Sequence, residues 1–170
     1  MHKKQTGDAD SWRSWPDLAG RLVGRTHVLP VRVYYEDTDM SGVVYHAGYL
    51  RFLERGRTDF LRLLGIGHSA LSAGDDGEPL FFAVRSMSLE FLRAAMIDDL
   101  VEVVTVPGAI QGARCQLSQE VRKGEVVLVH ADVTVALIND KARPRRIPPP
   151  LRDKLLAFAG LVNTSLTPQE

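Results

Sequence analysis

The chain has 170 residues, of which 45% are hydrophobic and 25% are charged, as is usual for one globular domain. Lysine plus arginine and aspartate plus glutamate each number 21, so the formal net charge is zero. A neutral chain is not expected to bind nucleic acid through a globally basic surface. No apolar run approaches the roughly 20 residues that span a membrane, and a single cysteine excludes an internal disulfide.

Residues 1–26 are polar, interrupted by glycine and proline, and only weakly patterned. We predict a loosely ordered N-terminal extension, although Trp12 and Trp15 could anchor a short amphipathic turn on the domain. The segment lacks the apolar stretch of a secretory signal, so we expect the protein to be cytoplasmic. We expect a C-terminal tail at 161–170, which leaves 27–160 as a single domain.

From residue 27 onward the pattern predicts one strand, one long helix and then four more strands. The strand at 27–35 alternates apolar and polar side chains. The helix at 48–64 has apolar residues at i, i+3 and i+4 spacing, with its arginines mostly facing outward. Gly56 lies on the apolar side, which suggests close approach to another backbone. Four further strands are expected at 80–92, 99–110, 113–124 and 125–138, and a short helix is expected at 148–160.

This order of elements indicates an α+β fold in which a sheet of about five antiparallel strands lies beside one long helix. A tight hairpin is expected at residues 123–125, between the last two strands. No internal repeat is evident, and no linker interrupts residues 27–140.

The connection between the first strand and the helix is acidic, because Glu36, Asp37 and Asp39 fall within four residues. Mutual repulsion means that at most one or two of them should face a common site. Asp39 precedes a glycine-containing turn at Gly42, and a helix N-terminus, whose free amides can stabilise an oxyanion, follows soon after. Asp39 could therefore attack an acyl carbon or activate a water, or could only satisfy loop amides.

Other chemistry-bearing residues have simpler interpretations. Residues 37–42 fit the start of an EF-hand calcium loop, but Gly48 stands where that loop needs glutamate. The histidines and Cys115 lack metal-ligand spacing, so we expect no metal and no other cofactor. Cys115 is expected in the core, and Glu54 is a second candidate acid for which an ion pair with a nearby arginine is the simpler explanation.

Three segments together resemble a known family. They are VRVYYEDTDMSGVVYHAGYLRFLERGRTDFLR at 31–62, FFAVRSMSLEFLRAAMIDDLVEV at 81–103 and KARPRRIP at 141–148. They resemble the hotdog-fold acyl-CoA thioesterases of the 4-hydroxybenzoyl-CoA thioesterase type, and within these the YbgC-like branch, which is linked to the Tol–Pal envelope system and to lipid metabolism. The resemblance covers roughly residues 30–150 and implies a curved antiparallel sheet wrapped around the long helix.

The resemblance also implies an activity and a site. Acyl-CoA would be hydrolysed to free acid and CoA, with the family's catalytic aspartate at Asp39 and its oxyanion-binding backbone amide at His46. Tyr45 would line the site, and Gly42 would be the turn glycine. Gly48 departs from the pattern, because many relatives have asparagine or another polar residue there.

Assembly and partners follow from the same resemblance. Family members form dimers or tetramers with the acyl-CoA site between subunits, so we expect a homo-oligomer. One alternative is an interaction module that binds acyl carrier protein or lipid-synthesis enzymes and has little hydrolytic activity. Another is a dehydratase on the same fold, which would need a pattern of histidine and aspartate that this sequence lacks. The arginines that could hold CoA phosphates are Arg85, Arg114, Arg143, Arg145 and Arg146.

Overall fold

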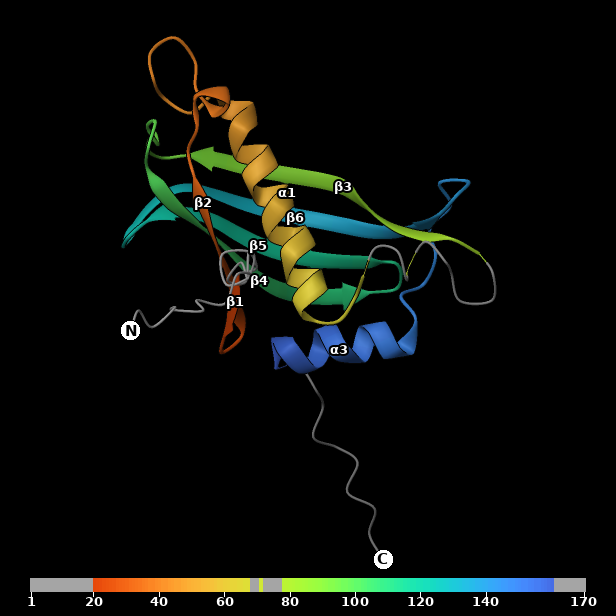
Figure 1. The fold of residues 1–170 in the computed structure, drawn as a ribbon. Coiled ribbons are helices and arrows are strands. Elements are labelled where there is room, and N and C mark those ends of the chain that lie inside the picture. The colour runs from red at the N-terminus through yellow and green to blue at the C-terminus, as the bar shows by residue number, and fades with distance from the viewer. Residues whose placement is uncertain (1–19, 68–70, 72–77, 161–170) are drawn as a thin grey trace, which may run out of the picture.

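The computed structural model describes residues 20–67, 71 and 78–160 (Figure 1). Its main element is a six-stranded sheet in the order β1-β2-β4-β5-β6-β3, with every neighbouring pair antiparallel. Helix α1 (His46–Leu63) crosses one face of the sheet, and α3 (Pro149–Ala159) lies near its C-terminal end (Figure 1). The predicted α+β fold is confirmed. The strands are β1 (Arg21–Val23), β2 (Thr26–Arg32), β3 (Leu80–Phe91), β4 (Leu100–Gln111), β5 (Arg114–Lys123) and β6 (Val126–Asn139).

The sheet has six strands rather than about five because Arg21–Val23 pairs with β2. All three residues of this strand are exposed, so the sequence shows no apolar alternation there. Gly24, with φ of +59°, turns the chain between the two strands. Residues 21–26, which the sequence pattern assigns to the extension, therefore form part of a β-hairpin of the sheet, while residues 1–19 and 161–170 lie outside the described part of the chain.

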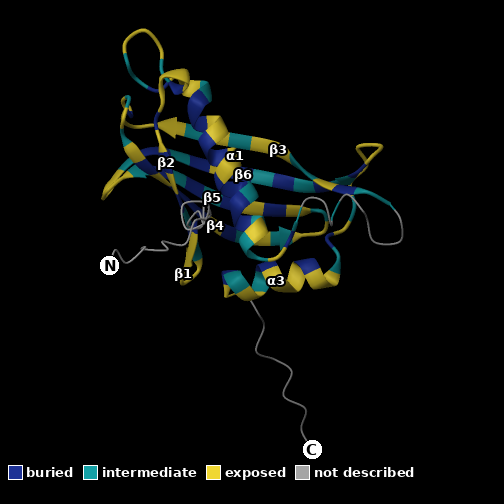
Figure 2. Ribbon diagram, in the orientation of Figure 1, coloured by how far each residue is buried: buried dark blue, intermediate teal, exposed yellow. Residues whose placement is uncertain are grey.

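Helix α1 packs its apolar side against the sheet, and Figure 2 shows buried residues alternating with exposed ones along the helix. Phe52, Leu53 and Phe60 of this helix are almost fully buried. A Cβ atom added to Gly56 would lie 2.6 Å from Cγ1 of Val103 in β4. The close approach at Gly56 is thus made to side chains of the sheet, and the predicted approach to another backbone is wrong.

A buried polar network joins α1 to the sheet. Arg57 is only 7% exposed, unlike the other arginines of the helix, because its Nη1 donates to Oε1 of Gln119 at 2.8 Å. Nε2 of Gln119 donates in turn to the Leu53 carbonyl at 3.1 Å and to Oγ1 of Thr105 at 2.9 Å. One side chain of β5 therefore satisfies a buried guanidinium and a helix carbonyl together.

Gln119→Leu should lower the free energy of unfolding by about 3 kcal/mol, because Arg57 loses a buried acceptor while keeping its charge. Urea unfolding measures this loss. The double variant Arg57→Met/Gln119→Leu should recover part of it, since the buried guanidinium is then removed while the Thr105 hydroxyl still lacks its partner. A double variant that is no more stable than the single one would contradict this account of the network.

Candidate active site

Asp39 lies in a short hairpin between β2 and α1, at the end of the sheet where α1 begins (Figure 1). Thr38 and Val44 form an isolated antiparallel bridge, and the Gly42 N–H donates to the Asp39 carbonyl at 3.0 Å. Gly42 has φ of +78°, a conformation that favours glycine. Asp39 and His46 are therefore each within two residues along the chain of the same bridge.

This hairpin is held from outside by the segment 92–97. The Val44 N–H donates to the Ala95 carbonyl at 2.8 Å, and the Ile97 N–H donates to the Gly42 carbonyl at 3.1 Å. Backbone hydrogen bonds on both sides of the turn fix its position relative to the sheet.

The Asp39 carboxyl group is exposed, and one of its two oxygens is occupied within the hairpin. Oδ1 accepts hydrogen bonds from the Ser41 N–H at 2.8 Å and the Ser41 hydroxyl at 2.5 Å. The hydroxyl, and then the N–H, lower the pKa of Asp39 below its ordinary value, so the group is a carboxylate at neutral pH. Oδ2 accepts no hydrogen bond from the described residues, which leaves it available to a substrate or a water.

The N-terminus of α1 has backbone donors without intrahelical acceptors. The helix begins at His46, two residues before the predicted start, and no side chain caps it. The Tyr45 N–H donates to the Asp37 carbonyl at 3.0 Å, whereas the His46 N–H has no acceptor among the described residues. The first turn has no acidic residue, so its positive end is not neutralised locally. The ring of His46 is exposed, as is the side chain of Tyr45.

The three acids of the connection have different environments. Asp37 is buried, with Oδ2 accepting from the Tyr34 N–H at 3.0 Å and Oδ1 lacking a partner in the described residues. Glu36 is exposed, as is Asp39. Gly48 packs against this turn, because an added Cβ would lie 3.2 Å from the Asp37 carbonyl oxygen. Asp37 is thus held within the turn, whereas the carboxyl groups of Glu36 and Asp39 are exposed.

A hollow of about 350 Å³ lies beside the helix start, and we call it the helix-start hollow. Its size falls in the range of small-molecule sites. Tyr49 is buried in its wall, with its hydroxyl accepting from the Ala95 N–H at 2.8 Å. The lining residues are Val44, His46, Tyr49, Phe91, Leu92, Arg93 and Ala94.

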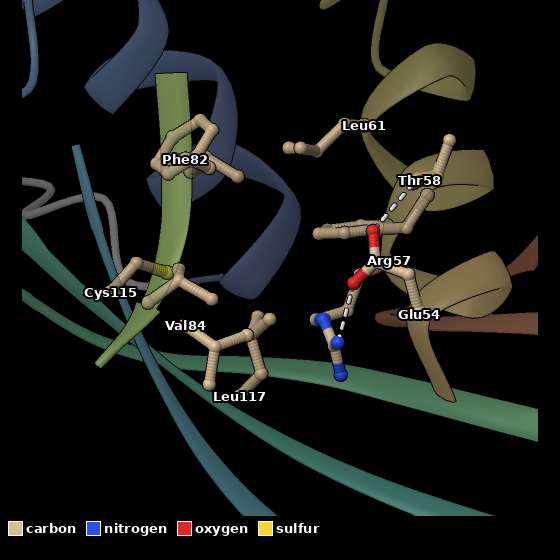
Figure 3. A pocket seen from close by; sticks show the side chains of 11 residues that line it. Glu54, Arg57, Thr58, Leu61, Phe82, Val84, Cys115 and Leu117 are labelled. Atoms are coloured by element: carbon tan, nitrogen blue, oxygen red, sulfur yellow. Dashed lines mark hydrogen bonds and ion pairs between the residues drawn. The ribbon is translucent and has the colours of Figure 1, made fainter. Parts of the chain in front are cut away.

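A smaller cavity of about 50 Å³ lies under the second half of α1 (Figure 3). Glu54 faces its edge and pairs with Arg57 at 2.5 Å, while its other oxygen accepts from the Thr58 hydroxyl at 3.2 Å. The ion-pair interpretation of Glu54 is therefore confirmed. Cys115 lines the cavity, is buried as predicted, and has its pKa raised to about 11 by burial. This cavity is too small for a substrate.

Two further properties concern the described residues as a whole. No helix among them is long and apolar enough to cross a membrane. They also contain no cluster of three histidine, cysteine, aspartate or glutamate side chains that could hold a metal ion.

Comparison with known proteins identifies the family. Residues 41–130 match the model of the thioesterase superfamily. Acyl-CoA thioesterase YbgC of Haemophilus influenzae is 40% identical over 120 residues, or 70% of this chain and 86% of that protein. Acyl-CoA thioester hydrolase YbgC of Escherichia coli is 40% identical over 121 residues, or 70% of this chain and 87% of that protein.

A solved structure extends the match to three dimensions. The crystal structure of a probable thioesterase from Bartonella henselae shares 50% identity with this chain and superposes with a TM-score of 0.70. The match covers 72% of this chain and 99% of that one. The chain therefore belongs to the thioesterase superfamily and adopts its hotdog fold.

Proposed function

We propose that the chain hydrolyses an acyl-CoA to a free acid and CoA, with Asp39 as nucleophile or general base. The observation that supports this most directly is one ionised carboxylate, with a free oxygen, held by a hairpin next to an uncapped helix N-terminus. Relatives 40% identical to the chain are named acyl-CoA thioesterases or thioester hydrolases.

In this mechanism the thioester carbonyl oxygen accepts a hydrogen bond from the His46 N–H, and the helix dipole stabilises the charge that develops there. Asp39 attacks the acyl carbon, or removes a proton from a water that does so, and the carbon–sulfur bond then breaks. Tyr45 lines the site beside His46, and Gly42 permits the turn that presents Asp39. The helix-start hollow takes the group attached to the carbonyl.

The test is to measure hydrolysis of a panel of straight-chain and aromatic acyl-CoAs. The free thiol of the released CoA reports the rate. We expect at least one substrate to be cleaved far faster than in buffer alone. Comparing the hydrolysis rate of the same acyl group on CoA and on acyl carrier protein would show which carrier the protein uses. A folded protein that binds acyl carrier protein and cleaves neither thioester would overturn the proposal and favour the alternative of an interaction module.

The hydrogen bond from Ser41 gives a pH prediction. Because it lowers the pKa of Asp39, the carboxylate persists to lower pH than an ordinary aspartate would. Ser41→Ala removes the hydroxyl donor, so the acidic limb of the kcat/KM profile should move to higher pH while the neutral plateau changes little. Ser41→Thr keeps a hydroxyl and serves as the control. Superimposable profiles for wild type and Ser41→Ala would show that this bond does not tune the catalytic group.

We also propose that the working form is a homodimer in which two copies meet along β3. This strand lies at one edge of the sheet and has twelve residues, so a long row of backbone groups is available for pairing. Apolar side chains on and after it are exposed, including Phe81, Phe91 and Leu92. The helix-start hollow includes the last two, so a second copy at this edge would help to enclose the substrate.

Phe81→Glu should shift the protein toward a single-chain mass in sedimentation velocity and lower its activity, because a charge replaces an apolar contact at the pairing edge. Leu22→Glu is the control, since Leu22 lies on the opposite edge strand with 40% exposure against 42% for Phe81. Dissociation by the control alone, or by neither variant, would count against an interface at β3.

A further inference from the structure

A buried contact holds the chain at the point where the described residues begin. Gly20 is buried, and its N–H donates to Oδ2 of Asp59, in α1, at 2.7 Å. The same oxygen lies 2.8 Å from Nε2 of His27, in β2. A Cβ atom at position 20 would lie 2.3 Å from the Val28 carbonyl oxygen, so this close approach requires glycine. Position 20 is therefore fixed against the second half of α1, and residues 1–19 are joined to the domain there.

The attachment point lies on a row of basic side chains along α1. Three exposed arginines are separated from one another or from Asp59 by three or four positions, a spacing that places side chains on one side of a helix. They are Arg51, Arg55 and Arg62, and we call them the arginine row. Arg51 and Arg55 form no ion pair within the described residues, and Nη1 of Arg62 lies 3.6 Å from Oδ1 of Asp59.

The arginine row is exposed, and none of the described elements covers it (Figure 1). It lies on the side of α1 that faces β2, because Asp59 meets His27 there. Glu54 and Thr58, each one position away along the helix, instead line the cavity beside β3 (Figure 3). The row is therefore separate from the β3 edge at which we place a second copy.

The segment that precedes the attachment point complements the arginine row in charge and in side-chain type. Residues 8–19, DADSWRSWPDLA, have a formal net charge of −2, from Asp8, Asp10 and Asp17 against Arg13. They also contain both tryptophans of the chain. Carboxylates pair with guanidinium groups, and indole rings stack on them. The segment thus carries the two kinds of side chain that an arginine surface binds.

The segment is also long enough to follow the arginine row. Arg51 precedes Asp59 by eight positions, which is about 12 Å along a helix that rises about 1.5 Å per residue. A chain reaches at most about 3.3 Å per residue, so about four residues cover this distance. Asp17, three residues before the attachment point, can therefore reach Arg55, and Trp15 can reach Arg51.

We propose that residues 8–19 dock on the arginine row of their own chain, with their aspartates paired to its guanidinium groups and their tryptophans stacked on it. A second copy or a separate acidic partner could also neutralise the row. The chain's own segment is favoured because it is tethered at the row itself, which gives an effective concentration in the millimolar range. This docking does not depend on the proposed hydrolysis.

Tryptophan fluorescence tests the proposal, because the chain has no tryptophan outside this segment. Acrylamide quenching is measured on the full-length protein at low salt and compared with a free peptide of residues 1–19. We expect the protein to show a shorter emission wavelength and weaker quenching than the peptide. Arg51→Glu/Arg55→Glu should lower the docking equilibrium constant about tenfold, since two attractions become repulsions. Quenching of this double arginine variant should approach that of the peptide.

Two further variants control for net charge. Arg152→Glu/Lys154→Glu, on α3, makes the same change in net charge and should be quenched like wild type. Adding Asp10→Lys/Asp17→Lys to the double arginine variant exchanges the signs of both surfaces and should restore protection. Wild type that is quenched as strongly as the peptide, or a double arginine variant as protected as wild type, would overturn the proposal.

A mixing experiment identifies which copy is the occupant. Full-length Trp12→Phe/Trp15→Phe keeps the arginine row and has no tryptophan, and it is added in excess to the double arginine variant. If the segment docks on its own chain, the tryptophans of the variant stay accessible to acrylamide. Renewed protection would assign the row to the segment of a second copy and overturn the assignment to the same chain.

Discussion

Asp39→Asn should lower kcat/KM for acyl-CoA hydrolysis by about 10²–10⁴-fold, the usual contribution of a positioned acid–base group. Asparagine keeps the size of the side chain and can still accept from the Ser41 N–H, but it cannot attack a carbonyl or take a proton. Because the Asp39 carboxyl is exposed, the variant should fold and melt like wild type. Steady-state kinetics together with circular dichroism measure both quantities.

Glu36→Gln is the matched control for Asp39→Asn, because it removes an exposed acid three residues away in the same connection. It should retain nearly full activity. If Asp39→Asn remains within tenfold of wild type, the catalytic assignment is wrong. Single-turnover hydrolysis in heavy-oxygen water then tests the two roles, since label in the Asp39 side chain supports a covalent anhydride, while its absence leaves the general base.

His46→Pro should lower kcat by about 10²–10³-fold, because it deletes the one backbone N–H that we assign to the oxyanion. Proline is tolerated at the first position of a helix, where that N–H has no intrahelical acceptor. The preceding residue, Tyr45, has φ of −64° and ψ of 140°, which is the conformation that proline favours before it. The loss should therefore appear in rate and not in melting temperature.

His46→Ala keeps the backbone N–H and removes the imidazole, so it separates the two parts of the residue. We expect it to retain most of the activity. An equal loss in His46→Ala and His46→Pro would instead assign the function to the ring, and no loss in either would remove position 46 from the mechanism.

The sequence predicted the larger elements to within a few residues because their patterns are long. The strands after α1 alternate over ten or more residues, and the helix keeps one apolar side for five turns. Strand β1 was missed because three exposed residues carry no alternation. The helix start was placed two residues late because Tyr45 at the N-cap provides no capping side chain that a sequence would reveal.

A candidate site could be chosen from the sequence, but the roles of its individual residues could not be assigned. Spacing alone does not distinguish a buried Asp37 from an exposed Asp39, since the difference depends on a turn whose hydrogen bonds reach the segment 92–97. The burial of Arg57 was missed for a similar reason, because its acceptor, Gln119, is 62 residues away.

The anchoring of the Asp39 hairpin on residues 92–97 has a consequence for enzyme engineering. Leu92, Arg93 and Ala94 line the helix-start hollow, so a library meant to change acyl-group preference would target them first. The same short segment carries Ala95 and Ile97, whose backbones hold the hairpin. Insertions or deletions there would displace the carboxylate as well as reshape the hollow, and selections for new substrates should therefore vary side chains at constant segment length.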